Sequence, residues 1–341
     1  MKKLKKIAAL MLTAAMSVSL MACGAGNGQA GAGNSSEAKG GSAATAKYKI
    51  GICRLLQHVA LDAATQGFKD ALTEKLGDDV YFDEQNASGE ASNCATICTT
   101  FVQNEYDLIL GNATAALQAA MAATNQIPVL GTSITDYPTA LGYKEGEEWT
   151  GTTGINISGT SDLAPLDKQA ECIKELFPDA KNIGILYCSG EPNSLYQAKV
   201  IGEALTGMGY TVENFSFSDS NDVAAVTQNA CDASDVIYIP TDNTAASNAE
   251  LICNVVEPAG VPVFAGEEGI CKGCGVATLS INYYDLGYAT GLQAYEILVN
   301  GADVSTMEVQ SAPNITKEVM KSRAEKYNLT IPDDYVAIPE E

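Results

Sequence analysis

The feature that most constrains the fold is an alternation of short β-rich runs with helix-length segments, which occurs twice along the chain. In the first series, residues 49–56 predict a strand and residues 60–76 a helix with apolar residues on one face. Such alternation is typical of parallel βαβ units. Further strands are predicted at residues 80–84, 107–110 and 127–130, and helices at 91–104 and 115–125.

A second series repeats this pattern from residue 182 onward. Strands are predicted at residues 182–188, 211–217, 236–240, 261–265 and 276–281, and the first helix at residues 195–208. The two series also share local sequence: KIGIC at Lys49 matches NIGIL at Asn182, and IPVLG at Ile127 matches VPVFAG at Val261. We interpret the chain as two similar α/β lobes that arose by duplication.

Length and charge narrow the function classes. A chain of 341 residues with 46% hydrophobic residues can build two globular domains. Its net charge of −22 repels phosphate backbones, so nucleic acid is not an expected partner. Ten cysteines are too few for a disulfide scaffold.

The N-terminus has the features of a lipoprotein export signal. Four lysines in the first six residues precede an apolar run over residues 7–21, which is too short to span a membrane. The run ends in Leu-Met-Ala-Cys at residues 20–23, which resembles the bacterial lipobox. We therefore expect a signal peptide over residues 1–22, a lipid on Cys23, and a flexible Gly/Ser/Ala-rich linker up to residue 47.

Two doubly wound lobes leave a cleft, and ligands of open parallel sheets bind beyond the carboxyl ends of the strands. Polar residues follow nearly every predicted strand, although the same residue types also cap helices. The candidate ligand-binding residues are Gln57, His58, Asn112, Thr114, Ser133, Asp162, Glu191, Asn193, Asp242, Asn243 and Glu267.

Several of these residues lie in motifs that resemble one known family. The motifs are QHVALDAA at 57–64, ITD at 134–136, GINISGTSDL at 154–163, EPNS at 191–194, TDNT at 241–244, FAGE at 264–267 and YYDLGY at 283–288. In this order they resemble the ABC-transporter substrate-binding lipoproteins that include the tryptophan and aromatic-amino-acid binders. The family usually has proline after the histidine, where this chain has Val59. The resemblance therefore does not determine the backbone of that loop.

The resemblance implies an α/β type I periplasmic-binding-protein fold, in which two doubly wound parallel-sheet lobes are joined by a three-crossover hinge. We expect the crossovers near residues 154–159, 280–283 and 310–314. The N-terminal lobe would comprise residues 48–155 plus 283–310, and the C-terminal lobe residues 156–282 plus 311–341.

The resemblance also implies a function without catalysis. It predicts a monomeric solute-binding component of an ABC importer that needs no cofactor and no metal. The protein would bind a small molecule, with an aromatic amino acid favoured, and present it to the permease subunits. It would lie on the outer face of the cell membrane, held there only by the lipid on Cys23.

An amino-acid ligand makes definite chemical demands on the site. Its carboxylate requires hydroxyl donors and helix N-termini, which Thr114 and Ser133 offer at strand-to-helix turns. Its ammonium requires a buried carboxylate, because an unpaired buried charge is costly. The candidates for that role are Asp242, Glu267 and Asp162.

The aromatic residues and the histidine are less informative. Tyr187, Tyr137 and Phe264 could wall a ring, but aromatic residues on strands usually belong to the core. His58 is the single histidine, which excludes a multi-histidine zinc site. Its place after the first strand favours a contact with the ligand or a gating role.

Two alternative functions stay open. Cys271 and Cys274 form a C-x-x-C pair, which occurs in thiol-redox and zinc proteins. Residues 269–275 predict a loop rather than a helix start, and Cys94 and Cys98 are spaced for one helix face, too far apart for a disulfide. The other alternative is the same binding fold serving a sensor for a different solute.

Overall fold

A computed structural model describes residues 42–43, 45–144, 146–312 and 314–340. The described residues belong to one compact unit. The expected signal peptide, Cys23 and most of the expected linker lie outside the described residues.

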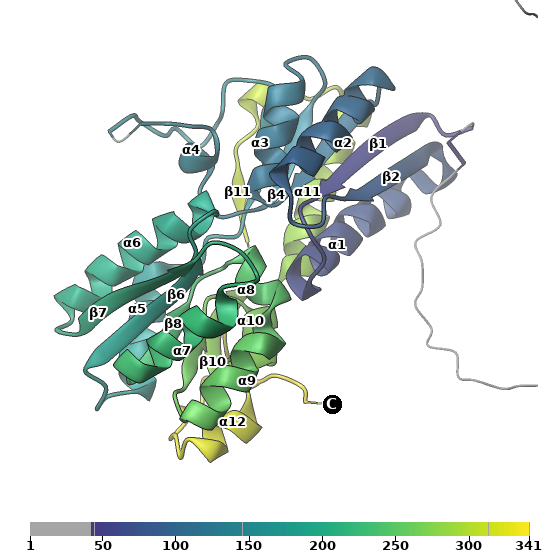
Figure 1. The fold of residues 1–341 in the computed structure, drawn as a ribbon. Coiled ribbons are helices and arrows are strands. Elements are labelled where there is room, and N and C mark those ends of the chain that lie inside the picture. Colours follow the sequence, from purple (N-terminus) through teal and green to yellow (C-terminus); the bar gives the residue numbers. More distant parts are fainter. Residues whose placement is uncertain (1–41, 44, 145, 313, 341) are drawn as a thin grey trace, which may run out of the picture. The chain divides into compact units, whose positions relative to one another are not determined.

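The first sheet confirms the predicted parallel architecture (Figure 1). Its order is β11-β5-β4-β3-β1-β2, and the pairings within it are parallel. Its strands are β1 (Tyr48–Arg54), β2 (Val80–Asn86), β3 (Leu108–Asn112), β4 (Val129–Ile134), β5 (Ile157–Ser161) and β11 (Gln310–Ser311). Its helices are α1 (Val59–Leu76), α2 (Ala91–Gln103), α3 (Thr114–Ala123), α4 (Tyr137–Ala140) and α11 (Tyr283–Asn300), with 3-10 turns at Gly77–Asp79 and Val304–Thr306.

Helices α1 and α11 run side by side against this sheet (Figure 1). Glycines allow their backbones to approach closely. A Cβ at Gly287 would lie 1.9 Å from the carbonyl oxygen of Ala64, and one at Gly67 would lie 2.1 Å from that of Tyr284. Helix α11 therefore packs on α1 through backbone contacts, and any side chain at Gly67 or Gly287 would disrupt them.

The second sheet has the order β13-β12-β10-β9-β8-β6-β7, with β12 antiparallel to β10. Its strands are β6 (Asn182–Cys188), β7 (Thr211–Phe217), β8 (Val236–Ile239), β9 (Val263–Ala265), β10 (Ala277–Ile281), β12 (Ile315–Val319) and β13 (Val336–Ala337). Its helices are α5 (Leu166–Leu176), α6 (Pro192–Gly207), α7 (Val223–Ala233), α8 (Asn243–Ser247), α9 (Ala249–Ala259), α10 (Glu268–Cys274) and α12 (Lys321–Lys326).

The chain crosses between the sheets after β5, after β10 and between β11 and β12. The last two crossings lie where the sequence placed them. The first crossing is later than expected, because Ile157 in β5 still pairs with Val129 in β4 of the first sheet. Residues 157–161 thus belong to the first lobe, and the boundary expected at residue 155 has to move beyond Ser161.

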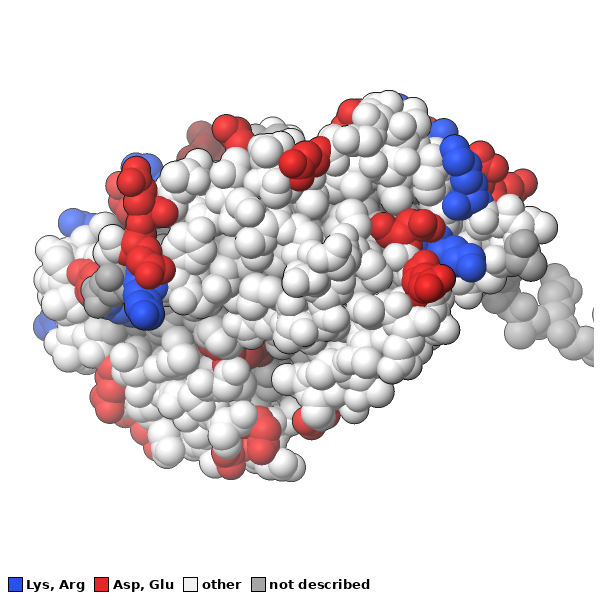
Figure 2. Space-filling view, turned by 90° about the horizontal axis from the view of Figure 1, so that it is seen from above, with Lys and Arg blue, Asp and Glu red and all other residues white. Residues whose placement is uncertain are grey.

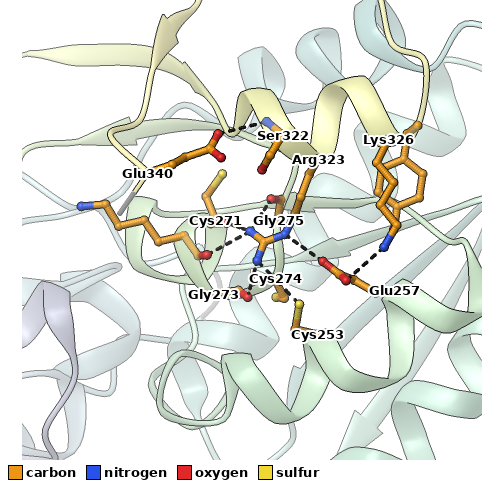
Figure 3. A network of polar contacts seen from close by, with 12 residues as sticks. Cys253, Glu257, Cys271, Gly273, Cys274, Gly275, Ser322, Arg323, Lys326 and Glu340 are labelled. Atoms are coloured by element: carbon orange, nitrogen blue, oxygen red, sulfur yellow. Dashed lines mark hydrogen bonds and ion pairs between the residues drawn. The ribbon is translucent and has the colours of Figure 1, made fainter.

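A second correction concerns residues 268–274, which form helix α10 rather than the expected loop. The side chain of Glu267 accepts hydrogen bonds from the first backbone N–H groups of the helix, so it supplies an N-cap. At the other end, the guanidinium of Arg323 in α12 donates to the carbonyl oxygens of Cys271, Lys272, Gly273 and Gly275 at 2.8–3.1 Å (Figure 3). Both ends of this short helix are satisfied by side chains that lie outside it.

The face of the molecule seen in Figure 2 has few charged residues at its centre. In Figure 2 the charged residues lie mostly around the margin of the view, and a broad middle region is uncharged. Within the described residues, none of the helices combines the length and the apolar character needed to cross a membrane.

Candidate functional site

The polar loops of the two lobes meet in direct contact. His58, at the start of α1, lies with its Nε2 atom 3.2 Å from Oδ1 of Asn243, at the start of α8. An open groove of about 740 Å³ beside this contact is lined by Gln57 and His58 from one lobe and by parts of α8, α9 and α10 from the other. Gln57 is exposed at this groove.

Four candidate residues have a buried polar atom that lacks a hydrogen-bond partner. These atoms are His58 Nδ1, Asn112 Oδ1, Ser133 Oγ and Asp162 Oδ1. Buried polar groups are rarely left without partners, because desolvation costs about 1–3 kcal/mol per group. Each of these four atoms can still exchange a hydrogen bond with a polar ligand that reaches it.

The first-lobe loops are also strained. Ala113 has φ 83° and ψ 158°, and Ser133 has φ 57°, although neither residue is glycine. The register of β4 against β5 shifts between Gly131 and Ile134, around Ser133. Backbone strain of this kind concentrates at functional sites. At Ser133 the strain coincides with the irregular pairing of β4 and β5.

Asn112 is held in one orientation by its amide nitrogen. Nδ2 donates to the carbonyl oxygen of Leu61 and to Oγ1 of Thr65, both at 2.9 Å. Oδ1 therefore faces away from α1. Thr114 follows as the buried first residue of α3, at the N-terminus of a ten-residue helix.

In the second lobe, Glu191 is fully engaged by donors of its own lobe. Its carboxylate accepts from the backbone N–H and side-chain amide of Asn243 at 3.0 and 2.7 Å, and from the backbone N–H and hydroxyl of Thr244 at 2.8 and 2.7 Å. The Asn193 amide adds a contact at 3.2 Å. This carboxylate has little capacity left for a ligand.

Asp242 and Glu267 also act as helix caps. Asp242 accepts from the backbone N–H groups of Cys188 and Ala245, both at 2.7 Å, and caps α8. Burial, together with the charge of Glu191, raises its pKa to about 8. Glu267 caps α10, and burial raises its pKa to about 7. The oxygens of both carboxylates are taken by backbone donors.

Asp162 differs from these two carboxylates. It lies between β5 and α5 with 3% of its surface exposed. Oδ2 accepts a hydrogen bond from the hydroxyl of Tyr283 at 2.9 Å, while Oδ1 has no partner. Burial raises its pKa to about 6, against the lowering effect of the nearby Thr135 and Tyr283 hydroxyls. Sequence reasoning missed Tyr283, although the residue lies in the YYDLGY motif that carried the family resemblance.

The three aromatic residues considered as ring walls are used by the fold. Tyr187 and Phe264 belong to the core of the second lobe. The hydroxyl of Tyr137 donates to the carbonyl oxygens of Gly131 and Ser158 at 3.1 and 3.3 Å. None of the three therefore explains ring binding by itself.

The C-x-x-C pair lacks the lowered pKa of a redox-active thiol. The nine cysteines of the described residues are all free thiols, and Cys271 and Cys274 are buried. Burial raises the pKa of both thiols, whereas a reactive cysteine needs a lowered pKa. Among the described residues there is also no group of three or more His, Cys, Asp or Glu side chains placed to hold a metal ion.

Comparison with known proteins assigns the chain to a family. Residues 49–341 match the family model described as ABC transporter substrate binding protein. The chain belongs to this family. It is a substrate-binding component of an ABC transporter, a non-enzymatic protein of a family that works outside the cytoplasm.

Three relatives cover most of the chain. It is 34% identical to a "Tyrosine-binding protein" of Clostridioides difficile (strain R20291), over 87% of this chain and 85% of the relative. A domain from Streptococcus pneumoniae, solved with L-Trp, is 32% identical with a TM-score of 0.79 over 84% of this chain and 97% of that one. A ligand-free, open substrate-binding protein with adhesive properties from Clostridium difficile is 33% identical with a TM-score of 0.65, over 86% of this chain and 100% of that one.

The L-Trp complex and the ligand-free, open structure differ in how well they superpose on this chain. At nearly equal identity, the chain fits the L-Trp complex better than the ligand-free, open structure. That difference agrees with the contact between His58 and Asn243 across the lobes. A more distant leucine-binding protein from Thermotoga maritima, 16% identical with a TM-score of 0.56 over 73% of this chain and 83% of that one, shares the fold alone.

Proposed function

We propose that the cleft binds an aromatic L-amino acid, with the ligand ammonium at Asp162 and its carboxylate at Ser133 and Thr114. The observation that carries this proposal is the partnerless Oδ1 of a buried Asp162. The names of two relatives, which specify tyrosine and L-Trp, support an aromatic side chain.

The ammonium assignment follows from the charge of the site. Burial raises the pKa of Asp162, because desolvation disfavours its ionised form. A ligand cation at Oδ1 would compensate that charge and supply the missing hydrogen bond. Asp242 and Glu267, the other two candidates, already receive backbone N–H groups at their oxygens.

The carboxylate assignment rests on the first lobe. Oγ of Ser133 is buried and without a partner, and it can donate to a carboxylate oxygen. Thr114 begins α3, whose first N–H groups and dipole favour negative charge. The two ends of the amino acid would then be held by the first lobe and by the crossover that contains Asp162.

A thermal-shift screen over amino acids, nucleosides and sugars tests the ligand class. At 100-fold excess over Kd, a ligand stabilises the native state by about 2.7 kcal/mol. We expect tyrosine or tryptophan to raise the melting temperature by several degrees, and sugars and nucleosides to leave it unchanged. A shift with a sugar or nucleoside alone would overturn the aromatic assignment and leave the fold intact.

We further propose that the protein is a monomer held by a lipid on Cys23 and that it delivers its ligand to an ABC permease for import. The lipobox-like residues 20–23 support the anchor. Replacing Cys23 with Ser is expected to release the protein from membranes with its ligand affinity unchanged, because residue 23 precedes the compact unit. Fractionation of producing cells measures the release, and a variant that stays membrane-bound would contradict the anchor.

A further inference from the structure

We propose that His58 sets specificity within the proposed aromatic site by accepting a hydrogen bond at Nδ1 from the ligand ring. The site would then prefer a ring that carries a donor, such as a phenol hydroxyl or an indole N–H, over a plain phenyl ring. The inference rests on the proposed function and concerns the side-chain end of the same ligand.

The argument starts at Asn243, whose amide is fixed in one orientation. Its Nδ2 donates to Oε2 of Glu191 at 2.7 Å. The same oxygen receives the backbone N–H of Asn243, so it acts as an acceptor, and the group of Asn243 that faces it must be the NH2 group. The amide oxygen of Asn243 must therefore point away from Glu191, toward the first lobe. There it lies 3.2 Å from Nε2 of His58.

That orientation fixes the tautomer of His58. An amide oxygen has no proton to give, so Nε2 must be the donor of this hydrogen bond. The pKa of His58 is lowered, chiefly by burial and to a smaller extent by Arg54. The hydrogen bond with Asn243 and the charges of Glu191 and Asp62 act in the opposite direction but do not outweigh burial. The ring is neutral, and a neutral imidazole with a proton on Nε2 leaves Nδ1 as an acceptor.

Nδ1 is buried and has no donor in the protein. His58 is the N-cap residue of α1, but its side chain makes no capping bond to the helix. His58 lines the groove between the two lobes, so a bound ligand can supply the missing donor. The ammonium and carboxylate of the ligand are assigned to Asp162 and Ser133, which leaves the ligand side chain to supply it.

Two variants separate the two nitrogens of the ring. In His58→Gln the side-chain amide can replace Nε2 as donor to Asn243, but nothing replaces Nδ1. In His58→Asn the shorter amide places an oxygen near the position of Nδ1 and gives up the contact with Asn243. Comparison of the two variants distinguishes ligand recognition from a role in holding the lobes together.

Calorimetric titration of the purified protein with L-tyrosine, L-tryptophan and L-phenylalanine tests the proposal. We expect the native protein to bind tyrosine or tryptophan at least about tenfold more tightly than phenylalanine, because phenylalanine leaves Nδ1 unpaired. His58→Gln should lose that preference with little change in phenylalanine affinity. His58→Asn should keep the preference while binding all ligands more weakly.

Equal affinities for the three amino acids in the native protein would overturn the role of His58 and leave the proposed aromatic site standing. An undiminished preference in His58→Gln would overturn it as well. If none of the three binds, the proposed function itself fails, so the two failures are distinguishable.

Discussion

Asp162→Asn is expected to weaken aromatic amino-acid binding by at least about a hundredfold. Removing one partner of a buried charge pair costs about 3–5 kcal/mol, because the remaining charge stays buried and unpaired. Calorimetric titration of L-tyrosine and L-tryptophan into the variant and the native protein measures the loss. Affinity of the native protein should also fall as the pH drops through about 6, where burial places the pKa of Asp162.

The same substitution should not weaken the fold. The pKa of Asp162 is raised from 3.8 to about 6, so its ionisation at neutral pH destabilises the ligand-free protein by about 2–3 kcal/mol. That penalty is present above the folded pKa and vanishes below the unfolded one. Asp162→Asn should therefore match or raise the melting temperature without ligand, and a variant that melts lower would show that the carboxylate is structural.

Asp242→Asn and Glu267→Gln are the matched controls. Both keep the size of a buried side chain. Neutralising a carboxyl whose pKa is raised by burial offsets the weakened cap, so these variants should change stability little and change affinity much less than Asp162→Asn. A hundredfold loss of affinity in either control, with Asp162→Asn unaffected, would move the ammonium site to the second lobe.

Arg323→Ala is expected to cause the largest loss of stability, about 3–5 kcal/mol, or roughly 10 °C in melting temperature. The substitution removes the donor to four backbone carbonyls at the end of α10 and the ion pair with Glu257 at 3.4 Å (Figure 3). The carbonyls of Gly273 and Gly275 would lose this donor, while that of Cys271 would keep the backbone N–H of Gly275. Thermal and urea unfolding of the purified protein measure the effect.

Lys326→Ala is the control for Arg323→Ala. Lys326 lies in the same helix and pairs with the same Glu257 at 3.0 Å, but its side chain is 46% exposed. Exposed ion pairs contribute about 0–1 kcal/mol, so this variant should unfold almost like the native protein. Arg323→Lys should show most of the stability loss of Arg323→Ala, because one ammonium group cannot reach four carbonyls. Similar losses in Lys326→Ala and Arg323→Ala would refute the capping role.

The sheet architecture could be predicted because each strand is a short apolar run followed by a polar loop. The strands β6 and β7 begin and end at the predicted residues. The boundary after residue 155 was wrong because GINISGTSDL contains two glycines and hides a strand, which only its pairing with β4 defines. Helix α10 was missed because its stability comes from Glu267 and Arg323, and Arg323 lies far along the chain.

The residue types of the site could also be predicted, but their roles could not. Sequence alone cannot separate a carboxylate that caps a helix from one that meets a ligand, since both follow a strand. Asp242 and Asp162 look alike in sequence, yet one receives two backbone N–H groups and the other keeps an oxygen free. The contact between His58 and Asn243, which lie 185 residues apart, likewise appears only in the folded chain.

A crystal structure of the protein with bound L-tyrosine or L-tryptophan tests the central claim most directly. The account predicts the ligand ammonium within about 3 Å of Asp162 Oδ1, and the ligand carboxylate at Ser133 and the first N–H groups of α3. The caps of α8 and α10 should stay intact. An ammonium at Asp242 or Glu267, with Asp162 Oδ1 still without a partner, would contradict it.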